Sequence, residues 1–318
     1  NAAGNGGVFY LGGGARLWLD DYVMDRPQIW VNQADNGGAV YAVAGSIIEC
    51  DGVDFNASPL SNEAREGSGG AFYLDASRLI ADNCVFRNNT ATLHGGAIAA
   101  FNSSEVEIGA DFGEPTAAVE GADRTSLSPL APDATPCNPL LVHCSSFSEN
   151  IADSDANGSG YGGAIYTNNS SLRLDSTWLH QNRADRGGGI FQTGETAMGV
   201  VTNSLFYENT VSTALGGGIR AEGGSFSMQH VTLADNHGGA GYSQHNTISE
   251  ARQSIAWNNE FGGFLGSFSA AACNIDQSSN AGIYADPLFV GSGNYHLQST
   301  SPAINACTAG LPLDLENQ

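Results

Sequence analysis

Short apolar stretches alternate with runs of Gly, Asn, Asp and Ser along almost the whole chain. Within stretches such as 164–167 and 172–175, apolar and polar residues alternate one by one. A period of two predicts half-buried β-strands. No stretch sustains the i, i+3, i+4, i+7 apolar spacing of a substantial amphipathic helix, so the pattern predicts an all-β protein.

Two motifs arrange these strands into a repeating unit. A Gly-Gly pair followed by small and apolar residues recurs at intervals from 22 residues (Gly216 to Gly238) to 32 residues (Gly37 to Gly69). One interval is longer, at 67 residues, and separates 95 from 162. The second motif places a large apolar residue three positions before an asparagine: Phe86 and Asn89, Phe147 and Asn150, Leu179 and Asn182, Phe206 and Asn209, Leu233 and Asn236. A period of this size indicates a solenoid.

Two or three short strands per period, turned by Gly and Asn, describe one coil of a right-handed parallel β-helix. Gly and Asn tolerate positive φ, so we expect both at the tight corners. Asparagine side chains of successive coils can then hydrogen-bond along the axis, while the apolar residue three positions earlier points into the core. A left-handed hexapeptide helix would require a six-residue apolar period, which the chain lacks. Ten coils at ~4.8 Å each would make a rod on the order of 50 Å long.

Alignment of the glycine pairs separates inward from outward positions. The position after each Gly-Gly-small unit is apolar and is expected to face inward: Phe9, Val40, Phe72, Ile98, Ile165, Ile190 and Ile219. The next position faces outward by alternation and is mostly aromatic: Tyr10, Tyr41, Tyr73, Ala99, Tyr166, Phe191 and Arg220.

The repeat runs through most of the 318 residues, which favours one elongated domain over two. We divide it into N-terminal coils (1–108), an insertion (109–143), C-terminal coils (144–306) and a tail (307–318). The insertion is rich in proline and fills the long interval between glycine pairs, so we expect it to form a loop that leaves the solenoid. The chain contains no apolar run of 18 residues, so no transmembrane helix is expected.

The chain is strongly acidic, with 33 acidic residues against 11 basic ones, no lysine and a net charge of −22. Such a charge repels nucleic acids and anionic membrane surfaces, which excludes both as expected partners. It also favours solubility in a salty or cation-rich exterior. The chain begins at Asn1 inside a repeat, so we expect a mature or trimmed chain, for which the missing signal peptide does not argue against secretion.

Six cysteines without a Cys-x-x-Cys motif favour disulfides over a zinc site. They are Cys50, Cys84, Cys137, Cys144, Cys273 and Cys307. Cys137 and Cys144 flank the end of the proline-rich segment and are expected to form a local disulfide. Cys50 and Cys84 lie one coil apart and within about one position of register, which is compatible either with a disulfide or with two free core thiols.

The paired motifs Gly-Gly-[Ala/Gly]-Ile and Phe-x-x-Asn resemble the repeats of polymorphic outer-membrane proteins and related bacterial right-handed β-helix surface proteins. Segments 285–290, 295–297 and 301–306 resemble the closing coils of such proteins, and 313–318 resembles the start of a tail that leads to a surface anchor. The resemblance covers about residues 1–306. It implies the fold more strongly than the activity, because this architecture carries adhesins, passenger domains and polysaccharide-degrading enzymes alike.

Enzymatic chemistry finds little support in the motifs. A β-helix lyase would need Lys or Arg beside acidic Ca²⁺ ligands, but lysine is absent and Arg220 is the one arginine in the outward column. A glycoside hydrolase would need converging carboxylates, and Asp20-Asp21 is the only adjacent Asp pair. We therefore assign no catalytic residues.

Two outward columns are candidates for binding. The aromatic column Tyr10, Tyr41, Tyr73, Tyr166 and Phe191 either stabilises the sheet by stacking or offers a flat platform to sugar rings or a partner protein. A second column, aligned before the asparagine corners, contains Glu49, Asp82, Asp175, Thr202 and Gln229. Its carboxylates either splay into water or hold a Ca²⁺ ion.

These observations favour an extracellular, non-catalytic protein of the bacterial cell surface that serves adhesion or surface assembly. Its expected partner is a glycan or a protein of a host or neighbouring cell. The alternatives are a secreted polysaccharide lyase or glycoside hydrolase, and a structural module of a fibre or appendage. The sequence leaves the oligomeric state open.

Overall fold

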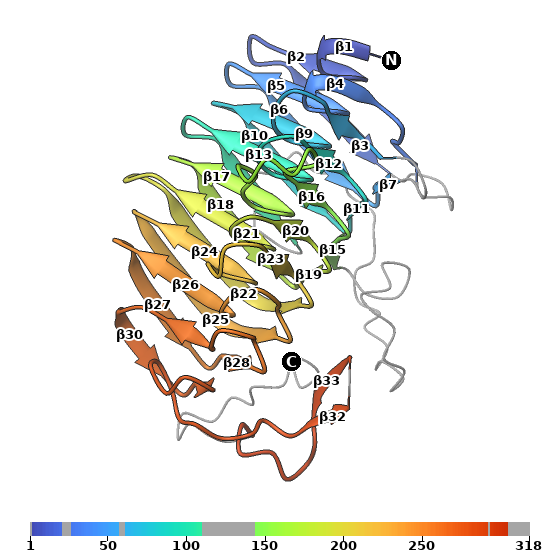
Figure 1. The fold of residues 1–318 in the computed structure, drawn as a ribbon. Helices are drawn as coiled ribbons and strands as arrows, with labels where there is room; N and C mark the ends of the chain where they lie inside the picture. The colour runs from blue at the N-terminus through green and yellow to red at the C-terminus, as the bar shows by residue number, and fades with distance from the viewer. Residues whose placement is uncertain (1, 21–26, 57–60, 110–143, 292, 305–318) are drawn as a thin grey trace, which may run out of the picture.

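The computed structural model describes residues 2–20, 27–56, 61–109, 144–291 and 293–304, which form strands joined by turns and short loops. Figure 1 shows the coils stacked one on another from the N-terminus toward the C-terminus. Strands of successive coils pair in parallel and build three long sheets along the axis. The expected all-β parallel β-helix is confirmed. None of the described residues forms an apolar helix of membrane-spanning length.

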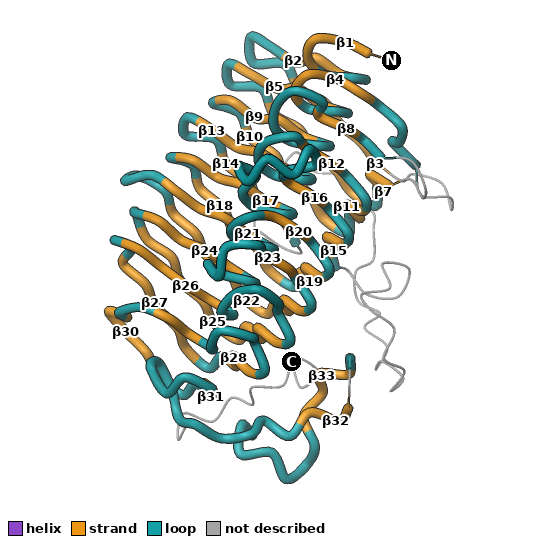
Figure 2. Tube along the Cα trace, viewed as in Figure 1, coloured by secondary structure: helices purple, strands orange, loops and turns teal. Residues whose placement is uncertain are grey.

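Coils up to β23 contribute in turn to a nine-stranded, a fifteen-stranded and a seven-stranded sheet, the later coils contribute to the first two, and loops join the strands at the corners (Figure 2). The nine-stranded sheet contains β2 (Phe9–Leu11), β5 (Val40–Val43), β9 (Phe72–Asp75), β13 (Ile98–Phe101), β17 (Ile165–Asn168), β21 (Ile190–Thr193), β24 (Ile219–Glu222), β26 (Tyr242–His245) and β29 (Phe264–Leu265). The seven-stranded sheet contains β1 (Ala2–Asn5), β4 (Gln33–Asn36), β8 (Glu63–Ala64), β12 (Thr90–Ala91), β16 (Ile151–Ala152), β20 (Arg183–Ala184) and β23 (Thr210–Val211).

The fifteen-stranded sheet has two halves, which two long strands join into one sheet. One half contains β3 (Arg16–Asp20), β6 (Ile47–Asp51), β10 (Arg78–Asp82), β14 (Glu105–Ile108), β18 (Ser171–Asp175), β27 (Ile248–Arg252) and β30 (Phe268–Ala272). The other contains β7 (Asp54–Asn56), β11 (Val85–Arg87), β15 (Ser145–Ser148), β19 (Thr177–His180), β28 (Ile255–Trp257) and β31 (Ile275–Asp276). The ten-residue strands β22 (Met198–Tyr207) and β25 (Ser225–Ala234) span both halves.

One asparagine per coil locks the stack from within. We call Asn62, Asn89, Asn150, Asn182, Asn209, Asn236 and Asn259 the asparagine ladder, and all seven are buried. The Asn182 amide nitrogen donates to Asn209 Oδ1 at 2.9 Å and to the Phe147 carbonyl at 3.0 Å. Its Oδ1 accepts from the side chain and main-chain nitrogens of Asn150 at 2.9 and 3.1 Å. All four hydrogen-bonding positions are thus filled, and the expected bonding along the axis is confirmed.

The positive φ at this corner lies one residue earlier than the expected asparagine. Glu149, Gln181 and Glu208, which precede ladder asparagines, have φ of 57°, 55° and 54°. The asparagine amide is needed for the ladder, so the residue before it, whose side chain is free to face solvent, adopts the left-handed conformation instead.

The Gly-Gly pairs are required by close contact between coils. Gly69 has φ of +72°, and a Cβ atom there would overlap the Phe72 carbonyl. A Cβ atom on Gly70 would overlap the carbonyl of Gly96, its counterpart in the next coil. The first glycine therefore makes the turn, and the second lets the coils approach.

The core is a continuous apolar column between the sheets. The inward residues Val40, Phe72, Ile98, Ile165, Ile190 and Ile219 have no exposed surface, while Phe9 in the first coil is half-buried. The phenylalanines that precede the ladder stack on one another, with ring centroids 5.1 Å apart for Phe55 and Phe86 and 4.4 Å apart for Phe86 and Phe147. The predicted inward positions are confirmed.

Cys50 and Cys84 form a buried disulfide. The expected register was wrong, however, because Cys50 lies opposite Ala81 and Cys84 lies three positions further, beyond the end of β10. The bond therefore joins one coil to the following corner of the next. Cys144 and Cys273 are also disulfide-bonded. Cys137, Cys307, the residues 110–143 of the expected insertion and the tail lie outside the described residues.

The C-terminal end is closed by a hairpin rather than by further coils. Strands β32 (Phe289–Gly291) and β33 (Asn294–Leu297) pair with each other in antiparallel fashion. Leu297 and Ala303 pack against Ile255 and Ile275 at the end of the stack. The closing segments thus cap the core without extending it, which corrects the expectation of closing coils. Nine stacked strands make a rod of about 40 Å at 4.8 Å per coil.

We expect Asn182→Asp to destabilise the fold by at least about 3 kcal/mol at pH 7, because it removes both ladder donors and buries a carboxylate against two acceptors. Burial raises the pKa of the new carboxyl above its unfolded value, so the penalty should shrink as the pH falls toward 4. Denaturant unfolding at both pH values measures this. Gln181→Asn, at the preceding exposed position, is the control and should cost little; equal losses would show that the ladder is not the support.

Ile165→Asp and Ile190→Asp should each cost more than about 4 kcal/mol, because each buries an unpaired charge in the core. Tyr10→Ser, on the outer face of the same sheet, should change the unfolding free energy by less than about 1 kcal/mol. Thermal and chemical denaturation compare the three variants. Comparable losses in all three would refute the assignment of inward and outward faces.

Candidate functional site

The outer side of the nine-stranded sheet carries three stacked tyrosines near the N-terminal end. Tyr10, Tyr41 and Tyr73 lie opposite one another on β2, β5 and β9. Ring centroids are 5.4 Å apart for the first pair and 4.8 Å for the second, with interplanar angles of 19° and 9°. Tyr10 is 63% exposed, whereas Tyr41 and Tyr73 are half-buried. We call these three residues the tyrosine face.

Tyr41 and Tyr73 of the tyrosine face stay un-ionised near neutral pH. Burial between neighbouring rings, together with smaller contributions from the adjacent Tyr41 and Asp75, raises the pKa of Tyr73 to about 12. Burial is also the main reason that the pKa of Tyr41 is raised. The face therefore offers aromatic surface and neutral hydroxyl groups, which can donate and accept hydrogen bonds.

The rest of the expected aromatic column is covered. Tyr166 and Phe191 point outward from the sheet but are only 5% and 2% exposed. His94 stacks on Tyr166 with ring centroids 4.4 Å apart, and Tyr161 stacks on Phe191 at 4.9 Å. Both covering residues belong to the corner immediately before a Gly-Gly pair. The predicted alternation of inward and outward side chains was correct. However, the outward side chains of Tyr166, Phe191 and Arg220 are covered by other residues and are not exposed to solvent.

Ala99 does not interrupt the aromatic stack, because other rings compensate. Phe101, two residues further on β13, stacks on Tyr73 with centroids 5.1 Å apart and approaches Tyr166 at 5.4 Å. Phe101 lies on the same side of the strand as Ala99 and is visible in the sequence by the same alternation.

Half-buried His94 is held neutral by its surroundings. Its ring lies between Tyr161 and Tyr166, and burial lowers the pKa of His94 to about 4. The guanidinium of Arg186 lies 5.3 Å from the Tyr161 ring centre and continues the stack. This part of the sheet is packed as an outer core.

The expected acidic column does not assemble. Glu49 lies opposite Trp18 and Ile80, so it is not in register with Asp82, and Arg16 lies 3.5 Å from its carboxylate. The two residues are two positions out of register, and the additional residue of corner 44–46 relative to corner 76–77 accounts for one of these positions. The position opposite Asp82 is Asp51.

The carboxylate of Asp175 is engaged in hydrogen bonds with neighbouring side chains. Its carboxylate accepts hydrogen bonds from Asn203 at 2.9 Å, from Ser176 at 3.1 Å and from Thr202. Thr202 and Gln229 follow it in register, as expected. The three carboxylates assigned to Ca²⁺ therefore do not form one site.

No group of three or more His, Cys, Asp or Glu side chains in the described part of the chain is arranged to hold a metal ion. The strongest sequence signal for Ca²⁺ is elsewhere, at Asp153, Asp155, Asn157 and Gly158, which match the D-x-D-x-N-G start of a calcium loop. Position twelve, where such a loop has a bidentate glutamate, is the buried core residue Ala164. Asp153 instead accepts bonds from the main-chain nitrogens of residues 157 and 158 at 2.9 and 3.1 Å. Asp21 of the Asp20-Asp21 pair lies outside the described residues.

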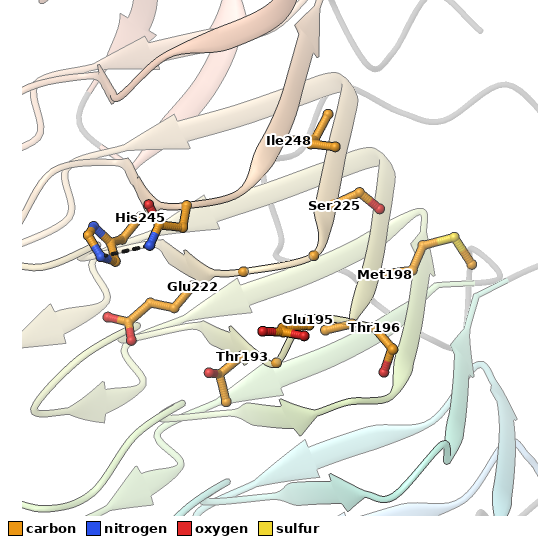
Figure 3. Close-up of a pocket in the computed structure, with 13 residues that line it drawn as sticks. Thr193, Glu195, Thr196, Met198, Glu222, Ser225, His245 and Ile248 are labelled. Atoms are coloured by element: carbon orange, nitrogen blue, oxygen red, sulfur yellow. Dashed lines mark hydrogen bonds between the residues drawn. The ribbon is translucent and has the colours of Figure 1, made fainter.

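An open groove of about 860 Å³ lies at the corner between the nine-stranded and fifteen-stranded sheets. Figure 3 shows Glu222 and His245 on one side and Met198, Ser225 and Ile248 on the other. A hydrogen bond of 3.2 Å joins the His245 ring to the Asn246 amide. Sequence reasoning missed this groove because it is formed by three successive corners, of which 194–197 is two residues longer than the other two.

The acid stability of the fold should depend on His94. Its folded-state pKa of about 4 is below the unfolded value of about 6.5, so the unfolded chain binds the proton first. The contribution of neutral His94 to the unfolding free energy is complete above pH 6.5 and is lost as the pH falls toward 4. His94→Phe should keep the stack and reduce the loss of unfolding free energy between pH 6.5 and 4.

Urea unfolding across that range measures the difference between the His94→Phe variant and the unchanged protein. The pKa of His180 is lowered by burial too, so the unchanged protein should lose stability beyond the His94 share. His245→Phe, at an exposed ring, is the matched control. A His94→Phe profile parallel to that of the unchanged protein would contradict the assignment.

Comparison with known proteins identifies the repeat itself. Residues 83–100 and 145–168 match the family described as the Chlamydia polymorphic membrane protein repeat. The matched segments include β11 to β13 and β15 to β17, with ladder residues Asn89 and Asn150 and the glycine pairs that follow them. No curated protein and no solved structure matches the chain. The chain is therefore a parallel β-helix in which two segments match the polymorphic membrane protein repeat.

Proposed function

We propose that this chain is a non-catalytic, extracellular β-helix of a bacterial cell surface that serves adhesion or surface assembly. The observation that carries the proposal is the polymorphic membrane protein repeat in two consecutive coils. A rod of stacked coils holds its outer surfaces at fixed spacing from one end to the other, which suits contact with extended partners. The net charge of −22 keeps such a surface soluble and disfavours non-specific contact with anionic polymers.

The tyrosine face is the proposed contact surface. Its three rings are stacked in register and repeat at the coil spacing, with Tyr10 the most exposed. A tyrosine offers an apolar ring and a polar tip, which suits both a sugar ring and a flat protein surface. Each ring contributes on the order of 1 kcal/mol, so binding would depend on several rings together. The expected partner is a glycan or a protein on a host or neighbouring cell.

Simultaneous replacement of Tyr10, Tyr41 and Tyr73 by Ser should weaken binding to cells or immobilised glycans at least tenfold. Binding is measured on whole cells and on an array of acidic and neutral glycans. Tyr284→Ser, which removes an aromatic ring that is 69% exposed at the other end of the rod, is the matched control and should bind normally.

Thermal unfolding of the same variants distinguishes a role of the tyrosine face in binding a partner from a role in stabilising the fold. If binding survives the triple replacement while thermal stability collapses, the tyrosine face is structural and its proposed role fails.

The enzymatic alternatives are tested by incubation with polysaccharides, with and without Ca²⁺, while unsaturated products and reducing ends are followed. Turnover that a single Asp or Arg substitution abolishes would overturn the non-catalytic proposal. A stable trimer or filament in solution would instead favour the fibre module.

A further inference from the structure

The groove in Figure 3 lies beside a corner that is longer than the two corners that follow it. Strand β24 is joined to β25 by Gly223 and Gly224 alone, whereas residues 194–197 join β21 to β22 in the preceding coil. Both glycines have positive φ, of 83° and 61°, and a Cβ atom on Gly224 would overlap the Ala197 carbonyl. Residues 246 and 247 form a corner of the same two-residue length in the following coil, so corner 194–197 extends beyond both.

One wall of the groove is apolar and exposed. Met198, Ser225 and Ile248 lie in register at the beginnings of β22, β25 and β27. Met198 is 51% exposed and Ile248 is 65% exposed. They lie two coils apart, which is about 10 Å, with the small Ser225 between them.

These two residues stand apart from the other exposed apolar side chains. Within the described residues, the remaining large exposed apolar side chains belong to the first coil or to the C-terminal end: Val8, Tyr10, Trp18, Trp30, Phe261, Ile283, Tyr284 and Val290. Along the middle of the rod, large apolar exposure is thus concentrated in this groove. Exposed apolar surface that is confined to a polar-rimmed groove is typical of a binding site.

The opposite wall is acidic. Glu195 is exposed and pairs with no arginine in the described part of the chain. Glu222 is held by Arg220 at 2.9 Å and by Arg186 at 3.8 Å, and both contacts are made to Oε1. The groove lining contains Glu195 and Glu222 but neither Lys nor Arg. A ligand that enters the groove meets negative charge on one side and aliphatic surface on the other.

We propose that this groove docks a lysine or arginine side chain of a basic partner protein. The aliphatic stem of the side chain packs between Met198 and Ile248 over Ser225, and its cationic head is held by Glu195 and by Glu222 Oε2. Long cationic side chains combine an apolar stem with a charged tip, which matches the two walls. The net charge of −22 draws a basic partner to the surface, and the groove then selects the side chain. This site is separate from the tyrosine face and does not depend on it.

Methionine methyl NMR tests the proposal on the intact chain. The three methionines are Met24, Met198 and Met228, and Met228 is fully buried in the core, so it serves as an internal reference. Titration with a hexalysine peptide should shift the Met198 methyl signal to saturation and leave that of Met228 unchanged. The same peptide with acetylated lysines should shift neither signal, because its head groups carry no charge.

Two variants separate the groove from general attraction to an acidic surface. Glu195→Gln should weaken hexalysine affinity about fivefold, whereas Glu66→Gln, at an exposed acid far along the chain, should change it less than about twofold. Ile248→Ser leaves the net charge unchanged and should also weaken affinity about fivefold. The proposal is overturned if Met198 does not respond, if the acetylated peptide binds equally well, or if Glu66→Gln weakens binding as much as Glu195→Gln.

Discussion

Register between coils is the constraint on which the remaining structure depends, and the asparagine ladder enforces it. A ladder asparagine fills all four of its hydrogen-bonding positions only when the next coil presents its own asparagine at the same place. A shift of one residue would leave buried amides unpaired and turn each inward side chain to the outside. The stacked phenylalanines and the close approach at the Gly-Gly corners follow from the same alignment.

The outside of the rod is organised by the same register, with two consequences. Where aromatic side chains meet in successive coils they stack, as Tyr10, Tyr41 and Tyr73 do. Where an outward column contains alanine, an aromatic ring from another position in the chain occupies the space above it. His94 and Phe101 compensate for Ala99. Tyr295 of the closing hairpin packs on Tyr207 beside Ala234 and donates a hydrogen bond of 2.8 Å to Asp235. Small residues in these columns are therefore docking points for the chain's own corners and closing segment.

The corners, by contrast, differ in length and sequence from coil to coil, and they give this β-helix its specific surface features. A long corner brings Tyr161 over the sheet and buries Phe191, while a two-glycine corner leaves the groove beside Met198 and Ile248. Because the strands are fixed by pairing, insertions and deletions are absorbed at the corners, where they either cover or expose the outer face. The two proposed contact surfaces differ for this reason: one is a bare part of a strand column, and the other is a gap between corners.

The sequence by itself determined the fold class, the inward residues and the asparagine ladder. Each depends on a short motif whose chemistry has few alternatives: glycine at a corner without room for Cβ, and asparagine where two donors and two acceptors must be met. It did not determine which outward residues are exposed, because the rings over Tyr166 and Phe191 come from corners of the preceding coil. It also misplaced Glu49 and Cys50, in part because one additional corner residue shifts the register of the following strand by one position. Only the tertiary structure decided these points, since corner length and side-chain cover are settled by packing between coils and not by the repeat.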